Sequence, residues 1–174
     1  PDHNRPRSVT FSPNGRTALS IERSTMHHWD LKTGTEIQRI NLPAIGWGVA
    51  YTPDGNSALV AMAGLGDIIQ YDLSSGEEIQ RLGDDNDISG HSDNFPVMDI
   101  AVSADGKKVF TGSQGDERTL YLWDLETGES RQLDWISPLT ALAMSPDGKT
   151  IVFLRAPARD AYSPGPRPTE AKRA

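Results

Sequence analysis

The chain has 174 residues, of which 36% are hydrophobic, and this is enough to bury the core of one ordinary domain. Its formal net charge of -7 opposes electrostatic attraction to phosphates, so we expect neither nucleic acid nor an anionic membrane as a partner. Cysteine is absent, which excludes disulfides and thiolate metal sites and leaves the cellular compartment open, with a slight preference for the cytoplasm. The chain opens at Pro1 on polar residues, and we expect it to be a fragment of a longer protein.

A four-residue turn phrase occurs four times, with the copies 40, 51 and 42 residues apart. Each copy has Ser or Thr first, Asn or Asp third and glycine fourth, residues that bond back to the backbone and adopt positive φ in tight turns. The copies are Ser12-Pro13-Asn14-Gly15, Thr52-Pro53-Asp54-Gly55, Ser103-Ala104-Asp105-Gly106 and Ser145-Pro146-Asp147-Gly148. Each phrase therefore predicts a hairpin connection.

Apolar residues alternate with polar ones before each turn, as Val9 and Phe11 do before the first. This period of two is typical of strands with one buried face. A second short strand is predicted after each turn, over 18–21, 58–61, 108–111 and 150–154.

A second phrase follows three of these hairpins in step with the first. Its copies begin Trp29-Asp30-Leu31, Tyr71-Asp72-Leu73 and Trp123-Asp124-Leu125, and each reaches a glycine three residues later. Another short run with alternating residues comes after each glycine, for example 36–40. Four strands per repeat follow from the two phrases together.

A repeat of about 40 to 45 residues, with four strands and a Trp-Asp dipeptide closing the third, resembles the WD-repeat propellers. Gly90-His91 lies 32 residues before Trp123, which is similar to the interval between the Gly-His and Trp-Asp dipeptides of that family. The resemblance implies an all-β fold, a partial WD-repeat β-propeller made of four-stranded antiparallel blades. The composition is also similar to that of bacterial WD-repeat proteins.

The propeller blades are expected over residues 1–154, and the rest of the chain is expected to be different. The repeats are predicted at about 8–48, 49–98 and 99–140, with an incomplete fourth repeat at 141–154. Residues 155–174 are rich in proline and charge and leave little to bury, which predicts a disordered tail.

The resemblance also implies a structural hydrogen-bond set in the third repeat. The matching positions are His91, Thr111 or Ser113, Asp116 and Trp123. Such a set ties strands together because buried polar groups are tolerated when they satisfy one another. We therefore predict no catalytic residues here.

Two histidines and one acidic loop are further candidates for functional sites. His28 stands in a slot that holds Leu122 in the third repeat, and it is interpreted as bonded to backbone, the alternative being a pH-responsive or partner-facing side chain. His27 and His28 are adjacent in a predicted strand and point to opposite faces, so they cannot share a metal ion. The segment 85–96 begins like a calcium loop but has Pro96 where the bidentate glutamate belongs, so we predict no metal site and no cofactor.

A protein-binding face is predicted from one repeat position, two residues before the leading apolar residue of each first strand. In propellers of this kind that position faces the binding rim, and here it holds Arg7, Trp47, Met98 and Thr140. Arg, Trp and Met are enriched at interface centres, so Arg7, Trp47 and Met98 are candidates, with Trp135 as a fourth. The alternative for Trp47 and Trp135 is that they cover blade edges.

These observations predict a non-catalytic protein-protein interaction scaffold that presents a loop-rich propeller face to a partner protein. The alternative is an accessory propeller of a larger enzyme, a kinase or hydrolase whose catalytic domain lies outside this chain. A third interpretation is self-association that completes the ring, since a closed seven-bladed ring needs roughly 290 residues.

Overall fold

The computed structural model describes residues 6–63, 67–83, 97–113, 119–135, 139–145, 150–155 and 170–173. The regular structure in these ranges is β-structure throughout. Within them, no helix is long and apolar enough to cross a membrane.

The strands form four antiparallel sheets, each built from strands that follow one another in the chain. The first sheet consists of β1 (Pro6–Phe11), β2 (Thr17–Glu22), β3 (Thr25–Asp30) and β4 (Glu36–Asn41). The second consists of β5 (Gly46–Tyr51), β6 (Ser57–Met62), β7 (Ile68–Asp72) and β8 (Glu78–Leu82). The third consists of β9 (Val97–Val102), β10 (Lys108–Ser113), β11 (Thr119–Asp124) and β12 (Ser130–Trp135). The fourth has β13 (Leu139–Met144), β14 (Thr150–Arg155) and β15 (Glu170–Arg173).

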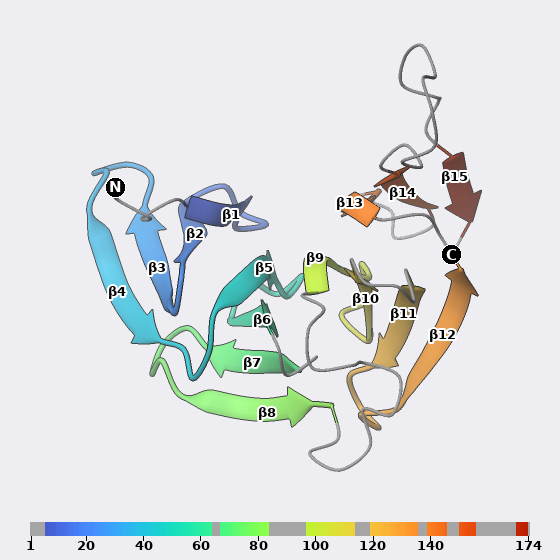
Figure 1. Ribbon diagram of the computed structural model, residues 1–174. Helices are drawn as coiled ribbons and strands as arrows, with labels where there is room; N and C mark the ends of the chain where they lie inside the picture. Colours follow the sequence, from blue (N-terminus) through green and yellow to red (C-terminus); the bar gives the residue numbers. More distant parts are fainter. Residues whose placement is uncertain are drawn as a thin grey trace, which may run out of the picture.

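The sheets stand side by side in an open arc, with their first strands β1, β5, β9 and β13 on the inside (Figure 1). The strands β4, β8 and β12 lie on the outside of the arc. The expected all-β architecture of four-stranded antiparallel blades in an unclosed propeller is confirmed.

Both repeated phrases form turns in which a side chain replaces missing backbone partners. In the turn between β5 and β6, Thr52 Oγ1 accepts a hydrogen bond from the backbone N–H of Ser57, and Gly55 adopts a φ of 75°. In the turn between β7 and β8, Asp72 accepts the backbone N–H groups of Ser74 and Ser75. The hydrogen bond from the Ser74 hydroxyl, followed by these two backbone bonds, lowers the pKa of Asp72 to about 2. The aspartate of the Trp-Asp phrase is therefore a turn-forming residue.

The core lies between neighbouring sheets and not within one of them. Leu19 and Ile21 of the first sheet pack in one cluster with Val49 and Val60 of the second, and all four are at most 4% exposed. A second cluster joins Leu59 to Ile100 across the next interface, and a third joins Phe110 to Leu142 and other residues of the fourth sheet. Full burial of a side chain such as Leu stabilises the fold by roughly 1.5–3 kcal/mol, so each sheet depends on its neighbours.

Hydrogen bonds from side chains of the inner strands also tie adjacent sheets together. Ser8 Oγ accepts the backbone N–H of Val49 at 3.2 Å, and Asp99 Oδ2 accepts that of Leu142 at 2.7 Å. Burial raises the pKa of the Asp99 carboxyl, although its backbone hydrogen bonds act in the opposite direction. Gly48 holds the position in the second sheet that is equivalent to Ser8 in the first and Asp99 in the third. It packs so closely on the third sheet that an added Cβ would lie 3.3 Å from Asp99 Cα.

The repeat boundaries predicted at 48/49, 98/99 and 140/141 fall inside β5, β9 and β13 and are corrected by two or three residues. The reason is a β-bulge near the start of each first strand, where the pairing register shifts, as between Gly46 and Gly48. A bulge interrupts the alternation on which the prediction was based, so the strand seemed to begin after it.

The disordered tail predicted for residues 155–174 is also corrected for part of its length. Arg155 belongs to β14, and Glu170–Arg173 form β15, which pairs antiparallel with Thr150–Phe153. An unpaired strand edge offers a row of free backbone groups, which a polar segment can pair with although it has little to bury. The remainder of the tail lies outside the described residues.

Candidate protein-interaction surface

The four positions predicted for the binding rim are the bulge residues of the four first strands. Register shifts between Pro6 and Ser8 and between Gly46 and Gly48 leave Arg7 and Trp47 as the unpaired residues of β1 and β5. The same shifts leave Met98 in β9 and Thr140 in β13, whose side chains lie outside the described part of the structure. A bulge turns a side chain away from the direction that regular pleating would give it. Each first strand therefore carries one bulge residue at the same position, and Arg7 and Trp47 are the two whose side chains are described.

Arg7 and Trp47 meet across the interface between the first two sheets. The guanidinium carbon Cζ of Arg7 lies 4.0 Å from the centroid of the Trp47 ring, a cation–π arrangement worth about 0.5–1 kcal/mol at an exposed site. Arg7 is exposed and Trp47 is half-buried. The indole Nε1 of Trp47 is buried and has no hydrogen-bond partner among the described residues. The pair thus combines an exposed cation, an aromatic face and an unused donor.

Trp135, the fourth residue predicted for this face, is the last residue of β12. It lies on the outer strand of the third sheet and pairs with Thr119 of β11, not with a first strand. The structure therefore gives it a different place in the blade from Arg7, Trp47 and Met98.

The predicted hydrogen-bond set of the third repeat is described in part. Trp123 Nε1 donates to Thr111 Oγ1 at 2.9 Å, and these residues are 5% and 1% exposed. Of the two alternatives for the hydroxyl, Thr111 is thus the one bonded to Trp123; the side chain of Ser113 is not described. His91 and Asp116 lie outside the described residues.

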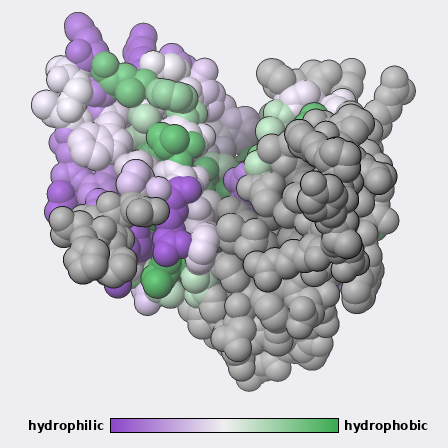
Figure 2. Space-filling model, turned by 45° about the horizontal axis from the view of Figure 1, so that its top comes forward, coloured by the Kyte–Doolittle hydropathy of each residue, from purple (hydrophilic) through white to green (hydrophobic). Residues whose placement is uncertain are grey.

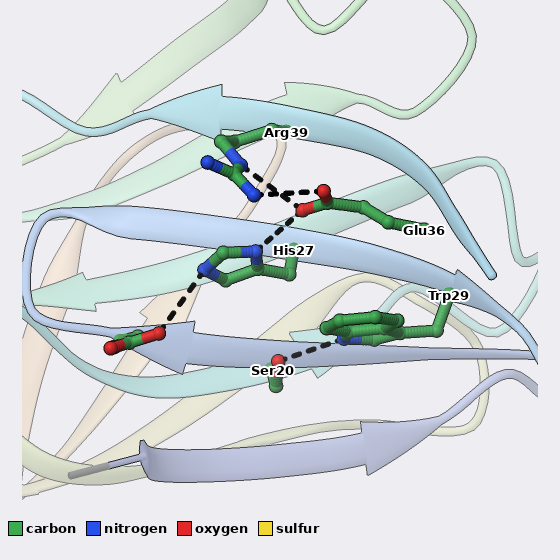
Figure 3. Close-up of polar contacts among 6 residues, drawn as sticks. Ser20, His27, Trp29, Glu36 and Arg39 are labelled. Carbon is green, nitrogen blue, oxygen red and sulfur yellow. Dashed lines mark hydrogen bonds and ion pairs between the residues drawn. The ribbon is translucent and has the colours of Figure 1, made fainter. Parts of the chain in front are cut away.

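An equivalent tryptophan in the first sheet belongs to a larger polar cluster (Figure 3). Trp29 Nε1 donates to Ser20 Oγ at 2.9 Å, as Trp123 does to Thr111. The ring of His27 stacks on Trp29, with centroids 5.8 Å apart. His27 Nδ1 lies 2.5 Å from Glu36 Oε1, and its Nε2 lies 3.7 Å from Glu22 Oε2.

Arg39 completes this cluster from the outer strand β4. Its Nη2 lies 2.9 Å from Glu36 Oε2, and Nε donates to Oε1 of the same carboxylate. The hydrogen bond from Arg39, followed by that from His27, lowers the pKa of Glu36. Each charged group of the cluster is therefore paired within the sheet. In the described ranges, no group of three or more His, Asp and Glu side chains is placed to hold a metal ion.

His28 corrects the expectation of a backbone-bonded histidine. Both ring nitrogens are buried and have no hydrogen-bond partner in the described structure, and the ring stands edge-on to Tyr51 with centroids 6.3 Å apart. Burial lowers the pKa of His28. His27 and His28 do point to opposite faces of β3, as expected. The equivalent Gln70 accepts a hydrogen bond from Gln80 at 2.7 Å, so the polar residue in this slot is bonded in the second sheet and not in the first.

Comparison with known proteins shows which family one of these repeats matches. Residues 85–124 match the family model described as WD domain, G-beta repeat, and the matched segment ends at the last residue of β11. The third blade therefore matches a WD repeat, and the other sheets share its strand order.

Two kinds of relative match this chain in sequence. A small ribosomal subunit protein, RACK1 from Candida albicans, is 37% identical over 89 residues, which cover 50% of this chain and 27% of that protein. The human pre-mRNA-processing factor 17 is 24% identical over 149 residues, 82% of this chain and 24% of that protein, and the mouse protein of the same name matches equally. The chain spans about a quarter of the length of these relatives.

A solved structure with the same arrangement of blades is the Kuenenia stuttgartiensis hydrazine synthase, with a TM-score of 0.76. The likeness covers 92% of this chain and 44% of that chain, at 21% sequence identity. At this identity the likeness shows the shared fold alone.

Sequence reasoning missed the bulges and the polar cluster on His27. The bulge had a weak signal, since two glycines flank Trp47 where strand residues with side chains are expected. Ser20 could have been found by aligning Trp29 with Trp123 through the strand pairing. The partners of His27 had no such signal, because Glu22, Glu36 and Arg39 have unremarkable spacing in the chain.

Proposed function

We propose that this chain is a non-catalytic scaffold that binds a partner protein through the rim formed by the bulge residues of its first strands. The observation that carries the proposal is the backbone bulge found at the same repeat position in all four sheets, at Arg7, Trp47, Met98 and Thr140. Bulges of this kind are used to direct side chains at functional sites.

The Arg7 and Trp47 pair supplies the energetic centre of this rim. Trp and Arg are the residue types that dominate interface energetics, and a rigid scaffold reduces the entropy lost on binding. The relatives named above, a protein of the small ribosomal subunit and a pre-mRNA-processing factor, agree with a role in assemblies.

The test is affinity capture with quantitative mass spectrometry, comparing the whole chain with Trp47→Ala and Arg7→Ala. We expect Trp47→Ala to weaken the captured partner by roughly 30-fold, because truncating a central Trp costs about 2 kcal/mol or more. Ile79→Ala is the matched control, since Ile79 is 52% exposed on the outer strand β8, away from the rim. Thermal unfolding confirms that each variant is folded. Partners that bind Trp47→Ala and Arg7→Ala as well as the unchanged chain would refute the proposal.

A further inference from the structure

One face of the first sheet lies at the end of the arc, and it carries apolar side chains of the kind that are buried between sheets elsewhere in the chain. Val49 and Tyr51 of β5 are 4% and 7% exposed because the first sheet packs on them. Val9 and Phe11 hold the same register positions in β1, opposite Ser20 and Ala18, as Val49 and Tyr51 stand opposite Val60 and Ala58. Yet Val9 is 65% and Phe11 66% exposed. The same position is therefore buried in one sheet and open in the other.

The tryptophan of this face supports the same conclusion. In the third sheet, Trp123 and its partner Thr111 lie on the face that the second sheet covers, where Trp123 packs with Leu59 and Leu82. The first sheet carries the equivalent pair, Trp29 and Ser20, on its open face. Figure 2 shows apolar surface exposed among hydrophilic residues on the left of the molecule, where the first sheet lies.

The opposite end of the arc presents the complementary face. Val152 of β14 is 37% exposed, whereas the equivalent residues of the other sheets, Leu19, Leu59 and Phe110, are at most 4% exposed. In those sheets the residue packs on the following sheet: Leu19 lies in one cluster with Val49 and Tyr51. At the interfaces inside the chain, the face that carries the residue equivalent to Val152 therefore packs on the face of the next sheet that carries the residues equivalent to Val9 and Phe11.

We propose that a second copy of this chain covers the open face of the first sheet with its fourth sheet, and that two copies close into one ring by two identical contacts. The interface continues the one that the chain already repeats between its own sheets. The number of sheets fits as well, since two copies with four sheets each bring eight together, within the range of about four to eight blades found in propellers. Head-to-tail contacts form a closed ring when the rotations that relate successive copies add up to a full turn. Two copies that each form half a ring meet this condition. This proposal is independent of the partner-binding rim.

The experiment is light scattering coupled to size exclusion on the whole chain, loaded at roughly 1 to 100 µM, a range that detects weak protein contacts. We expect a species of twice the 19.0 kDa of one chain, in a proportion that rises with concentration. Phe11→Ser should raise the concentration for half-dimerisation at least roughly tenfold, because it removes a large apolar side chain from the contact. Val152→Ser should do the same from the other face.

Ile37→Ser is the matched control for both variants. Ile37 is 52% exposed on β4, and the equivalent Ile79 is also 52% exposed although its sheet has neighbours on both sides, so this position stays open in a closed ring. The control should keep the dimer. A single-chain mass at all concentrations, a mass that grows without limit, or a dimer that survives both Phe11→Ser and Val152→Ser would overturn the proposal. Trp47→Ala should keep the dimer while losing the partner, which separates this test from that of the rim.

Discussion

His28 is the residue at which the repeat pattern and the local environment disagree most. It faces the second sheet beside Tyr51, in the slot that Gln70 and Leu122 occupy in the next two sheets. Leu122 is buried in an apolar cluster, and Gln70 finds the amide of Gln80. His28 makes neither kind of contact. Its two buried ring nitrogens therefore lose their hydrogen bonds to water on folding and gain none in the described structure.

We predict that His28→Leu stabilises the chain by about 1 kcal/mol at pH 7, measured by urea unfolding, because it removes an unsatisfied buried polar group. Burial lowers the pKa of His28 below its ordinary value of 6.5, so the unfolded chain binds a proton more readily. The stability of the unchanged chain therefore falls as the pH drops below about 6.5, and His28→Leu should lose this part of the dependence. Gln70→Leu is the control and should not stabilise, because it removes the shorter of the two hydrogen bonds that Gln80 Nε2 donates, the other being to Leu125 O. A less stable His28→Leu chain would contradict the interpretation.

At the scale of the blade, the same position of the repeat is occupied by two different kinds of residue pair. The first and third sheets pair an indole N–H with a hydroxyl, in Trp29 with Ser20 and Trp123 with Thr111. The second sheet replaces the hydroxyl with Val60 and the tryptophan with Tyr71, whose hydroxyl is buried without a partner among the described residues. The pair is therefore a device for joining β2 to β3 and β10 to β11, and the fold forms without it in the second sheet.

Thr111→Val should destabilise the chain by about 1–3 kcal/mol, because it leaves the buried N–H of Trp123 unpaired while keeping the shape of the side chain. Thr111→Ser keeps the hydroxyl and should recover most of this loss. Denaturant unfolding followed by tryptophan fluorescence measures both. Equal stability of the Val and Ser variants would show that the hydrogen bond contributes nothing.

At the scale of the whole molecule, the sheets are joined by packing and by single hydrogen bonds between inner strands. Asp99 makes the bond from the third sheet to the fourth, and Ser8 makes the bond from the first to the second. Since the fourth sheet has three strands in the described structure and the others four, its attachment to the third depends more on this contact.

Asp99→Ala should loosen the fourth sheet selectively, because the backbone N–H of Leu142 loses its acceptor. Amide hydrogen exchange should show faster exchange at Leu142, by roughly tenfold or more for a loss of about 1.4 kcal/mol or more. The amide of Val49, held by Ser8 at the other interface, is the internal control and should be unchanged. Unaltered protection at Leu142 would mean that packing alone holds the sheet.

Much of this architecture could be predicted from the chain alone. Alternating residues and turn phrases are local signals, and they placed the strands β2, β6, β10 and β14 within two residues of their bounds. The position that carries the bulge was also singled out from its place in the repeat, although the bulge itself was not predicted, since a bulge breaks the alternation of residues. The pairing of Glu170–Arg173 with β14 was missed because it depends on a free strand edge far away in the chain.

By itself, the sequence determined the repeat, the turns and which face of each strand is apolar, because these depend on residues within a few positions of one another. Only the tertiary structure decided that Arg7 lies over Trp47, that His27 joins Glu36 and Arg39, and that His28 is left unsatisfied. Each of these contacts brings together side chains from different strands or sheets, so its geometry follows from register, bulges and the packing of one blade on the next. The open faces at the two ends of the arc are decided there too, because exposure depends on what a neighbouring sheet covers.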